Sequence, residues 1–350
     1  MQRVSMQLTD VLSQQEDCEL VEITQETGWR FIGIKTTIFL IRLFFFLPSY
    51  AKKHQADVIL FSSMVTASVS HFIRKRTNVP MVGISHGHDV TLTNPMYQWL
   101  VPKIFRALDA CISVSSATQQ ECLNRGLDPS KSKVLPNGFD VKDLANIPPK
   151  DEAVYQLEQK FGFRLKEKKL LVTVGRLIKR KGHEWFIREV LPQIKSDVIY
   201  LVIGDGAEFN AISKAAAGSP ISDKILIAGR QPDEILQYAY AGADVFVMPN
   251  IKVPGDLEGF GVVLLEANVR QTPAIASDLE GIKDVITDGK NGYKIAVNDA
   301  KAFAEKIDEI IEKELPSLSL SSRTFVENKF SWIQVGQSYY NYLKEICSKY

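Results

Sequence analysis

The sequence predicts an α/β protein made of two doubly wound domains, each with a parallel sheet covered by helices. Short apolar runs ended by Gly, Pro, Ser or Asp alternate with helical patterns along most of the chain, which is typical of βαβ units. The chain has 350 residues, more than one ordinary domain contains. Residues 137–150 lack periodicity and contain Pro148 and Pro149, as expected of a linker between two domains.

The predicted strands form two series, one on each side of this linker. The first series lies at residues 19–23, 58–61, 80–85, 110–114 and 133–136. The second lies at residues 170–174, 198–203, 224–228, 245–249, 274–277 and 292–295. Residues 332–349 have the pattern of a terminal helix. We therefore expect domains at residues 1–147 and 148–328, and a helix within 329–350 that packs back on the N-terminal domain.

The composition argues against nucleic-acid binding and against a metal site. The net charge is +1, so no bulk positive charge attracts nucleic acid. The 4 cysteines form no CxxC pair, and no Cys/His cluster has zinc spacing. Such cysteines fit a reducing, cytoplasmic compartment. The polar, amphipathic N-terminus lacks the features of a signal peptide.

The apolar segment IFLIRLFFFL at residues 38–47 has two interpretations. It is too short to span a bilayer, and it contains Arg42. In the first interpretation it is a core helix between two strands. In the second it is a helix partly exposed to lipid, with Phe44, Phe45 and Phe46 in the interface. The second would make the protein peripheral on the cytoplasmic face of the membrane.

Two carboxylates eight positions apart, Glu258 and Glu266, bracket the stretch EGFGVVLLEA. If a helix begins near Gly261, Glu258 lies in the loop before it and Glu266 in its second turn. At about 1.5 Å per residue, the two are separated by roughly 10 Å. That separation suits the two ends of a nucleotide-sugar. The diphosphate between them would face a helix N-terminus, whose free N–H groups favour anions.

The loop VGRLIKRKG, after the strand predicted at 170–174, is a second candidate. We expect a helix to begin near Gly182, so that Arg176 and Lys181 lie at the carboxyl end of a strand. Two fixed cations there can hold a diphosphate, Arg through its planar guanidinium and Lys as a point charge. Charged loop residues are often only solvated, so the prediction depends on the glutamate pair as well.

Two further loops are less specific. In VIGDGAEFN, Phe209 takes the place of the third glycine of a dinucleotide fingerprint and Lys224 stands near the expected acid, which argues against NAD. In GISHGHDVT, His86 and His88 flank Gly87, but no further ligand cluster supports a metal. A histidine facing a cleft can instead hydrogen-bond a sugar hydroxyl near a reaction centre.

Taken together and in order, these motifs resemble the retaining nucleotide-sugar glycosyltransferases of family 4, which have the GT-B fold. The resemblance covers residues 57–350, and its marks are SHGHD, VSSAT, LPNGFD, VGRLIKRKG, IGDGAE, GRQPDEILQYAYAGADVFVMPN, LEGFGVVLLEA, IASDLEGIKDVITDGKNGY and FSW. It implies two Rossmann-like domains facing a cleft. The N-terminal domain would then serve the acceptor, and the C-terminal domain would bind the nucleotide-sugar.

The resemblance also implies roles for single residues. Arg176 and Lys181 match the cations on the donor diphosphate. Glu266 matches the carboxylate that grips the ribose hydroxyls, and Glu258 matches the carboxylate at the donor sugar. His86 matches the histidine of the first domain beside the transferred sugar. All of these except Glu266, which only binds the donor, are the expected catalytic residues.

Other matched residues contact the donor without acting on the reacting bond. Gly259, Phe260 and Gly261 offer backbone contacts to the sugar and the phosphate, and Arg230 falls where the backbone meets the base. His88 is the reserve candidate for the sugar-side histidine. The implied activity is hexosyl transfer with retention, from a UDP-sugar or GDP-mannose to a glycan or lipid-linked acceptor, in surface polysaccharide or glycolipid synthesis. No DxD motif occurs, so neither a metal nor another cofactor is expected.

The N-terminus departs from the family pattern. Members normally begin with a strand and a glycine-rich loop before a helix resembling MQRVSMQLTDVLS. In one interpretation the start is misassigned or the chain is truncated. In the other the shortened domain is real, and the protein binds a nucleotide-sugar with impaired catalysis. A sugar-nucleotide epimerase, which shares the architecture, is a further alternative.

Overall fold

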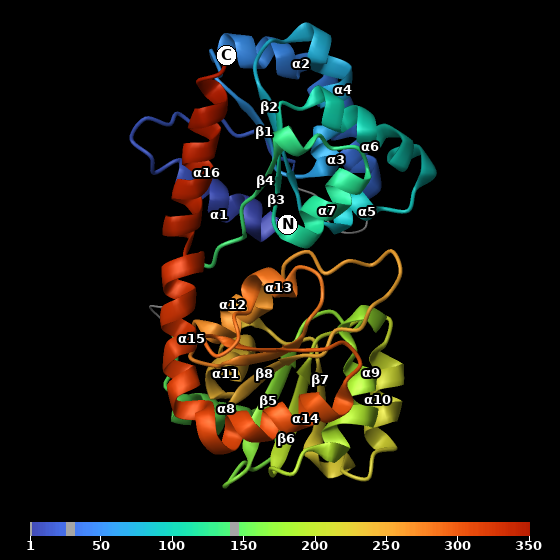
Figure 1. Cartoon of the computed structure of the whole chain (residues 1–350), viewed down its shortest axis with the longest axis vertical. Coiled ribbons are helices and arrows are strands. Elements are labelled where there is room, and N and C mark those ends of the chain that lie inside the picture. Colours follow the sequence, from blue (N-terminus) through green and yellow to red (C-terminus); the bar gives the residue numbers. More distant parts are fainter. Residues whose placement is uncertain (1, 26–31, 141–146) are drawn as a thin grey trace. The chain divides into compact units, whose positions relative to one another are not determined.

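A computed structural model describes residues 2–25, 32–140 and 147–350. The chain divides into two compact units (Figure 1): unit 1 consists of Met1–Gly138 and Trp332–Tyr350, and unit 2 of Phe139–Ser331. Each unit has its own parallel sheet and its own hydrophobic core. The two series of apolar runs predict two α/β sheets, and the structure confirms them.

Unit 1 contains a four-stranded parallel sheet in which sequence neighbours are also spatial neighbours. Its strands follow the order β1 (Ile59–Phe61), β2 (Met81–Ser85), β3 (Ala110–Ser113) and β4 (Ser132–Val134). Every residue of β2 is buried, as is typical of an inner parallel strand. The strand predicted at residues 19–23 is wrong. That segment has no regular structure, and both of its glutamates are exposed, so it lacks the burial that stabilises a strand.

Helices and 3₁₀ turns surround this sheet. They are α1 (Gln2–Leu12), α2 (Ile32–Lys53), α3 (Met64–Ala67), α4 (Ser70–Ile73), η2 (Arg74–Arg76), α5 (His88–Thr91), α6 (Pro95–Ala107), α7 (Ser116–Asn124), η3 (Pro129–Lys131) and α16 (Trp332–Cys347). The last helix packs beside α1. There Trp332 Nε1 donates to Gln7 Oε1 (2.9 Å), and the Tyr339 hydroxyl donates to Leu135 O (3.2 Å). Segments from both ends of the chain therefore complete unit 1.

Unit 2 contains a six-stranded parallel sheet. Its strands are β5 (Lys169–Val174), β6 (Val198–Ile203), β7 (Ile225–Gly229), β8 (Val245–Met248), β9 (Ala274–Ser277) and β10 (Gly292–Ile295), in the spatial order β10-β9-β8-β5-β6-β7. Alternate residues of a strand face opposite sides of the sheet. Tyr200 and Val202 of β6 face one core cluster, and Leu201 between them is also fully buried. Both faces of the sheet are therefore covered.

The covering elements of unit 2 form a layer on each face. They are α8 (Lys150–Phe161), η5 (Lys179–Lys181), α9 (His183–Trp185), η6 (Phe186–Val190), η7 (Leu191–Gln193), α10 (Phe209–Ala217), η8 (Ser222–Lys224), α11 (Asp233–Gly242), α12 (Val262–Asn268), α13 (Ile282–Val285), α14 (Ala300–Glu309), η9 (Ile310–Glu314) and α15 (Leu315–Phe330). Figure 1 shows α8 and α11 beside one face, and α9 and α10 beside the other. This arrangement leaves the carboxyl ends of the strands accessible to loops.

Candidate functional site

The strand order of unit 2 reverses between β5 and β8, and this reversal indicates where a ligand binds. From β5 the sheet continues through β6 to β7, whereas β8 lies on the other side of β5 and leads to β9 and β10. In open parallel sheets, ligands bind beyond the carboxyl ends of the strands at such a switch point. The loops after β5 and β8 carry Lys181 and Glu258, so the structure brings these two predicted residues together there.

Gly182 allows the two loops to approach each other. It precedes α9 with a φ of 66°, in the left-handed region. A Cβ at this position would lie 1.9 Å from Pro249 O, directly after β8. Because only glycine combines this φ with this backbone contact, the loop after β5 lies tightly against the loop after β8. The helix start predicted near Gly182 is confirmed.

Three side chains hold the Glu258 carboxylate. Lys181 Nζ lies 2.6 Å from Glu258 Oε2, and Arg180 Nη1 forms an ion pair with the same oxygen. Asn250 Nδ2 donates to it as well, at 3.0 Å. Arg180 is anchored in turn by Asp256, whose Oδ1 lies 3.0 Å from Arg180 Nε. Glu258 and Arg180 are both buried, so this is a solvent-protected ionic cluster.

The cluster keeps Glu258 ionised. Burial alone would raise the pKa of Glu258, but the positive charges of Lys181 and Arg180, with hydrogen bonds from Lys181 and Asn250, lower the pKa to about 2. For Lys181, burial outweighs the attraction of Glu258 and lowers the pKa. A buried carboxylate of this kind accepts hydrogen bonds and is a poor proton acceptor at neutral pH.

The backbone of Glu258 is fixed by the loop after β9. The Glu258 amide donates to a side-chain oxygen of Glu280, and Gly281 N donates to Glu258 O (3.1 Å). Burial raises the pKa of Glu280, against the effect of this hydrogen bond. Loops after β5, β8 and β9 therefore all position one carboxylate.

Glu266 lies on α12, whose N-cap is Gly261 with a φ of 84°. Glu258 lies in the preceding loop, so the predicted helix start near Gly261 is confirmed. The Tyr240 hydroxyl donates to Glu266 Oε2 (2.7 Å), and the carboxylate is partly exposed. Phe260 is buried, with its ring centroid 6.0 Å from that of Phe330, so it anchors this loop to the core.

The remaining predicted residues of unit 2 lie at the same edge of the sheet. Arg176 follows β5 and Arg230 follows β7, and both are exposed. The charge of Arg176 contributes to the lowered pKa of Lys181, which places the two cations within electrostatic reach. Gly259 lies between Glu258 and the buried Phe260.

In unit 1, His86 follows the carboxyl end of β2. Its ring Nε2 lies 2.9 Å from Ser62 O, and its amide donates to Asp89 Oδ1 (2.8 Å). Asp89 is buried and also accepts from Met64 N (2.8 Å). Burial lowers the pKa of His86, although Asp89 opposes this effect. His86 is thus a neutral, positioned imidazole, whereas His88 is exposed at the start of α5.

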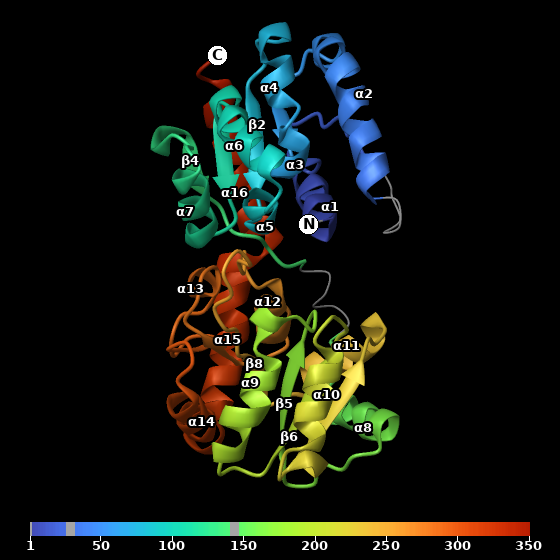
Figure 2. The same cartoon turned by 90° about the vertical axis from the view of Figure 1, so that its right-hand side faces the viewer.

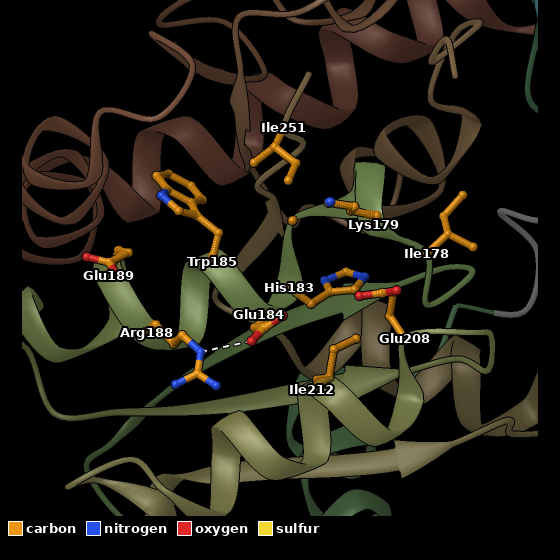
Figure 3. Close-up of a pocket in the computed structure, with 11 residues that line it drawn as sticks. Ile178, Lys179, His183, Glu184, Trp185, Arg188, Glu189, Glu208, Ile212 and Ile251 are labelled. Carbon is orange, nitrogen blue, oxygen red and sulfur yellow. Dashed lines mark hydrogen bonds and ion pairs between the residues drawn. The ribbon is translucent and has the colours of Figure 1, made fainter. Parts of the chain in front are cut away.

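Figure 3 shows a pocket of about 240 Å³. Its lining includes Lys179 and Gly182, the residues on either side of Arg180 and Lys181 in the chain. Its lining comes from the loop after β5, from α9 and α10, and from Ile251 after β8. His183 lines it, and both ring nitrogens are buried without a hydrogen-bond partner among the described residues. Burial first, and then the charge of Lys181, lower the pKa of His183 to about 3, so the ring is neutral. Within the described ranges, no group of three or more His, Cys, Asp or Glu is placed to hold a metal.

Sequence reasoning missed Arg180, Asn250 and Glu280. The run KRK in the loop after β5 was a signal for Arg180, but a run of cations does not reveal which member faces inward. The η5 turn directs Arg180 into the protein, where it is buried, while Lys179 is exposed. Asn250 lies in the same loop after β8 as Glu258, and their contact depends on how this loop folds. Glu280 is near Glu258 because β8 and β9 are adjacent strands.

Two family models match the chain, one in each half. "Glycosyltransferase Family 4" matches residues 8–143, and "Glycosyl transferases group 1" matches residues 156–329. Together they span most of the chain and include the ionic cluster in the second match.

Curated relatives are similar over most of their length. The GDP-mannose-dependent alpha-(1-6)-phosphatidylinositol monomannoside mannosyltransferase of Mycolicibacterium smegmatis is 23% identical, over 90% of this chain and 84% of that protein. The UDP-Gal:alpha-D-GlcNAc-diphosphoundecaprenol alpha-1,3-galactosyltransferase of Escherichia coli is 24% identical, over 81% of this chain and 74% of that protein.

Solved structures share the fold. Sucrose-phosphate synthase from Thermosynechococcus elongatus has a TM-score of 0.76 at 19% identity, covering 100% of this chain and 94% of its own. Anabaena HepE in complex with UDP has a TM-score of 0.73 at 19% identity, covering 88% and 82%. With two parallel α/β sheets in separate units, this likeness identifies the fold as GT-B.

Proposed function

Because this chain belongs to the glycosyltransferases of group 1 and family 4, we propose that it moves a hexose from a nucleotide-diphosphate sugar to a glycan or lipid-linked acceptor. Its role would lie in surface polysaccharide or glycolipid synthesis, and transfer would proceed with retention and without a metal. The observation that carries the proposal is the buried, ionised Glu258 beside Lys181 and Arg180 at the switch point of unit 2.

Lys181 has two partners in this proposal. Without donor it pairs with Glu258. When donor binds, its ammonium and the guanidinium of Arg176 contact the diphosphate and stabilise the charge that develops on the leaving phosphate. Arg180 keeps its contact with Glu258, so the carboxylate stays ionised and accepts a hydroxyl hydrogen from the transferred sugar. Arg180 touches no part of the donor and acts as a positioning residue.

The bond that breaks is the glycosidic C–O bond of the donor, which leaves a nucleoside diphosphate and an oxocarbenium-like sugar. The acceptor hydroxyl attacks from the same face, and the leaving phosphate takes its proton. Glu258 is not the nucleophile in this scheme. A carboxylate whose pKa is about 2 and whose Oε2 already accepts three donors is a weak nucleophile.

The other donor contacts extend from this centre. Glu266 accepts hydrogen bonds from the ribose hydroxyls, in a position that the Tyr240 hydroxyl helps to fix. Gly259 and Gly261 offer backbone N–H groups at the start of α12, where anions are favoured, and Arg230 lies near the base. In unit 1, His86 would contact the transferred sugar as a neutral imidazole.

The donor is a UDP-sugar or GDP-mannose. The two curated relatives are named for GDP-mannose and for UDP-Gal, which supports the class without deciding the base. A thermal-shift series with UDP, GDP and ADP tests it, because a ligand that binds only the folded state raises its stability by RT ln(1 + [L]/Kd). We expect one of UDP or GDP to raise the melting temperature, and ADP to do so least.

Transfer itself requires a second measurement. The protein is incubated with the matching labelled donor and a lipid extract, with EDTA in a parallel sample, and the released nucleoside diphosphate is quantified. Acceptor-dependent release in both samples, with an α-linked product from an α-linked donor, supports retaining, metal-independent transfer. If the protein binds the nucleotide but releases no nucleoside diphosphate with any extract, it is a binding protein and not a transferase. Conversion of the donor sugar in the absence of an acceptor would indicate an epimerase.

A further inference from the structure

Helix α2 is long and apolar enough to cross a membrane by length and composition, over Gly33–Lys53. One of its faces, however, already belongs to the core of unit 1. Leu43, Leu47 and Ala51 are buried there against residues of β1, α3 and α6. A helix that spans a bilayer would have to leave this core, so α2 packs in the protein and exposes only its other face.

The exposed face of α2 is an apolar stripe. Ile34, Ile38, Ile41 and Phe45 follow one another at spacings of four, three and four, so they lie along one side of the helix. Their exposed fractions range from 52% to 68%. An apolar stripe opposite a buried face is a hydrophobic surface with no partner among the described residues of unit 1.

The stripe continues onto neighbouring helices. Figure 2 shows α4 between α2 and α6. A groove of about 390 Å³ lies there, with an almost wholly apolar lining: Leu40, Ile41, Phe44, Ser68, Val69, Phe72 and Leu100. Phe72 on α4 and Met96 and Trp99 on α6 are also exposed, at 54%, 76% and 66%. The stripe, the groove and these three side chains form what we call the apolar face.

The elements that carry the apolar face are uniformly basic. Helices α2, α4 and α6 and turn η2 contain no Asp or Glu. Their cations are Lys35, Arg42, Lys52, Lys53, Arg74, Lys75, Arg76, Lys103 and Arg106. Of these, Arg74 forms an ion pair with Asp109 just outside these elements. Because the whole chain has a net charge of only +1, this is a local concentration of positive charge around apolar surface.

Contacts from Arg76 fix the position of α2 within the apolar face. Pro48 lies inside α2 and has no N–H, so the carbonyl of Phe44 has no helical donor. Arg76 supplies one: its guanidinium donates to Phe44 O and to Phe45 O, and it lies over the Phe44 ring at 5.0 Å. This contact ties α2 to η2 with a cation that still carries its charge.

We propose that the apolar face of unit 1 docks on the surface of an anionic phospholipid bilayer. The apolar side chains of α2, Phe72 and Trp99 enter the acyl boundary, and the surrounding cations contact the lipid phosphates. Charge complementarity favours this occupant over a second copy of the chain, because a symmetric contact would bring the cations of both copies together. The proposal does not depend on the donor or on catalysis.

The first test compares two pairs of exposed apolar residues. The intact chain is centrifuged with vesicles of phosphatidylglycerol and phosphatidylcholine, and with phosphatidylcholine alone. We expect binding to the anionic vesicles, and a loss of about tenfold or more in Ile34→Asp/Ile38→Asp. The control is Leu320→Asp/Ile333→Asp, which adds the same charge at exposed fractions of 64% and 62% elsewhere and should bind like wild type.

The second test addresses charge. Lys35→Gln/Arg42→Gln/Lys75→Gln should reduce binding by about tenfold or more, whereas Lys160→Gln/Lys214→Gln/Lys301→Gln in unit 2 should not. All six side chains are exposed, so unchanged circular dichroism is expected of both variants. No binding of wild type to anionic vesicles, or equal losses in test and control variants, would overturn the proposal. So would a dimer in solution that the Ile34→Asp/Ile38→Asp variant abolishes.

Discussion

At the scale of single residues, Glu258 differs most from an ordinary surface carboxylate. Its folded pKa of about 2 lies below the 4.5 of an unperturbed glutamate. A lowered pKa stabilises the folded state above the unfolded pKa, and this contribution is lost as the pH falls from about 4.5 toward 2. The difference of about 2 to 3 units between the unfolded and folded pKa of Glu258 corresponds to about 3 kcal/mol of folding stability at neutral pH.

We therefore expect Glu258→Gln to lower the free energy of unfolding at pH 7, because Arg180 and Lys181 lose their counter-ion. The difference in the free energy of unfolding between wild type and Glu258→Gln should shrink as the pH falls from 4.5 to 2.5, because wild-type Glu258 begins to protonate there. Urea unfolding at a series of pH values measures it. Glu167→Gln, at an exposed position, is the control and should show no such convergence. A gap independent of pH would mean that Glu258 is not held ionised by the cluster.

Glu266 leads to a prediction about binding. Its carboxylate lies on α12, within hydrogen-bonding distance of the Tyr240 hydroxyl, and we assign it to the ribose hydroxyls. Glu266→Ala should weaken binding of the preferred nucleoside diphosphate by about tenfold or more, as expected for lost charge-assisted hydrogen bonds. Isothermal titration calorimetry measures the Kd, with Glu234→Ala on the exposed surface of α11 as control. An unchanged Kd in Glu266→Ala would remove the basis for this donor site.

At the scale of elements, the meeting of the loops after β5 and β8 depends on Gly182. Gly182→Ala places a Cβ against Pro249 O in a left-handed backbone conformation. We therefore expect the free energy of unfolding to fall by about 2 kcal/mol or more. Gly162→Ala is the matched control. Gly162 also has a positive φ, of 73°, but nothing lies within 4 Å of its Cβ position. Gly162→Ala should therefore lower the free energy of unfolding by only about 1 kcal/mol, because it adds the strain of a positive φ but no steric contact. Equal melting temperatures of the two variants would show that the loop contact contributes nothing.

The elements also show what a sequence can and cannot predict. Strands β6, β9 and β10 have the predicted bounds. Every residue of β6 and β9 is buried, whereas the edge strand β10 also contains the half-buried Lys294. The run ELVEI at 19–23 mixes apolar and charged residues, as β10 does, but lies outside the sheet. Composition cannot distinguish the two cases, because the difference is the presence of neighbouring strands.

The same reasoning applies to the candidate site. Lys181 and Glu258 were predicted from local motifs, and they are in contact. Arg180 was missed, because its inward direction is set by the η5 turn and not by the identity of the residue. The pairing of Lys181 with Glu258 was also not predicted. Sequence reasoning assigned Lys181 to the donor diphosphate and Glu258 to the donor sugar, whereas their contact depends on β5 and β8 being adjacent.

At the scale of the whole molecule, two units with separate sheets and cores imply two unfolding transitions, because each core can be lost on its own. The proposed donor site lies in unit 2, so the preferred nucleoside diphosphate should raise the midpoint of one transition only.

Trp332→Ala should lower the midpoint of the other transition, that of unit 1. Trp332 is buried in unit 1, where it hydrogen-bonds Gln7, and its truncation costs about 3–5 kcal/mol. Differential scanning calorimetry of the full chain, with and without nucleotide, measures both effects. Tyr155→Ala on the exposed surface of α8 is the control and should change neither midpoint. If there is a single transition, and both nucleotide and Trp332→Ala shift it, the two units unfold together. The stability of the donor site would then also depend on residues at both ends of the chain, such as Gln7 and Trp332.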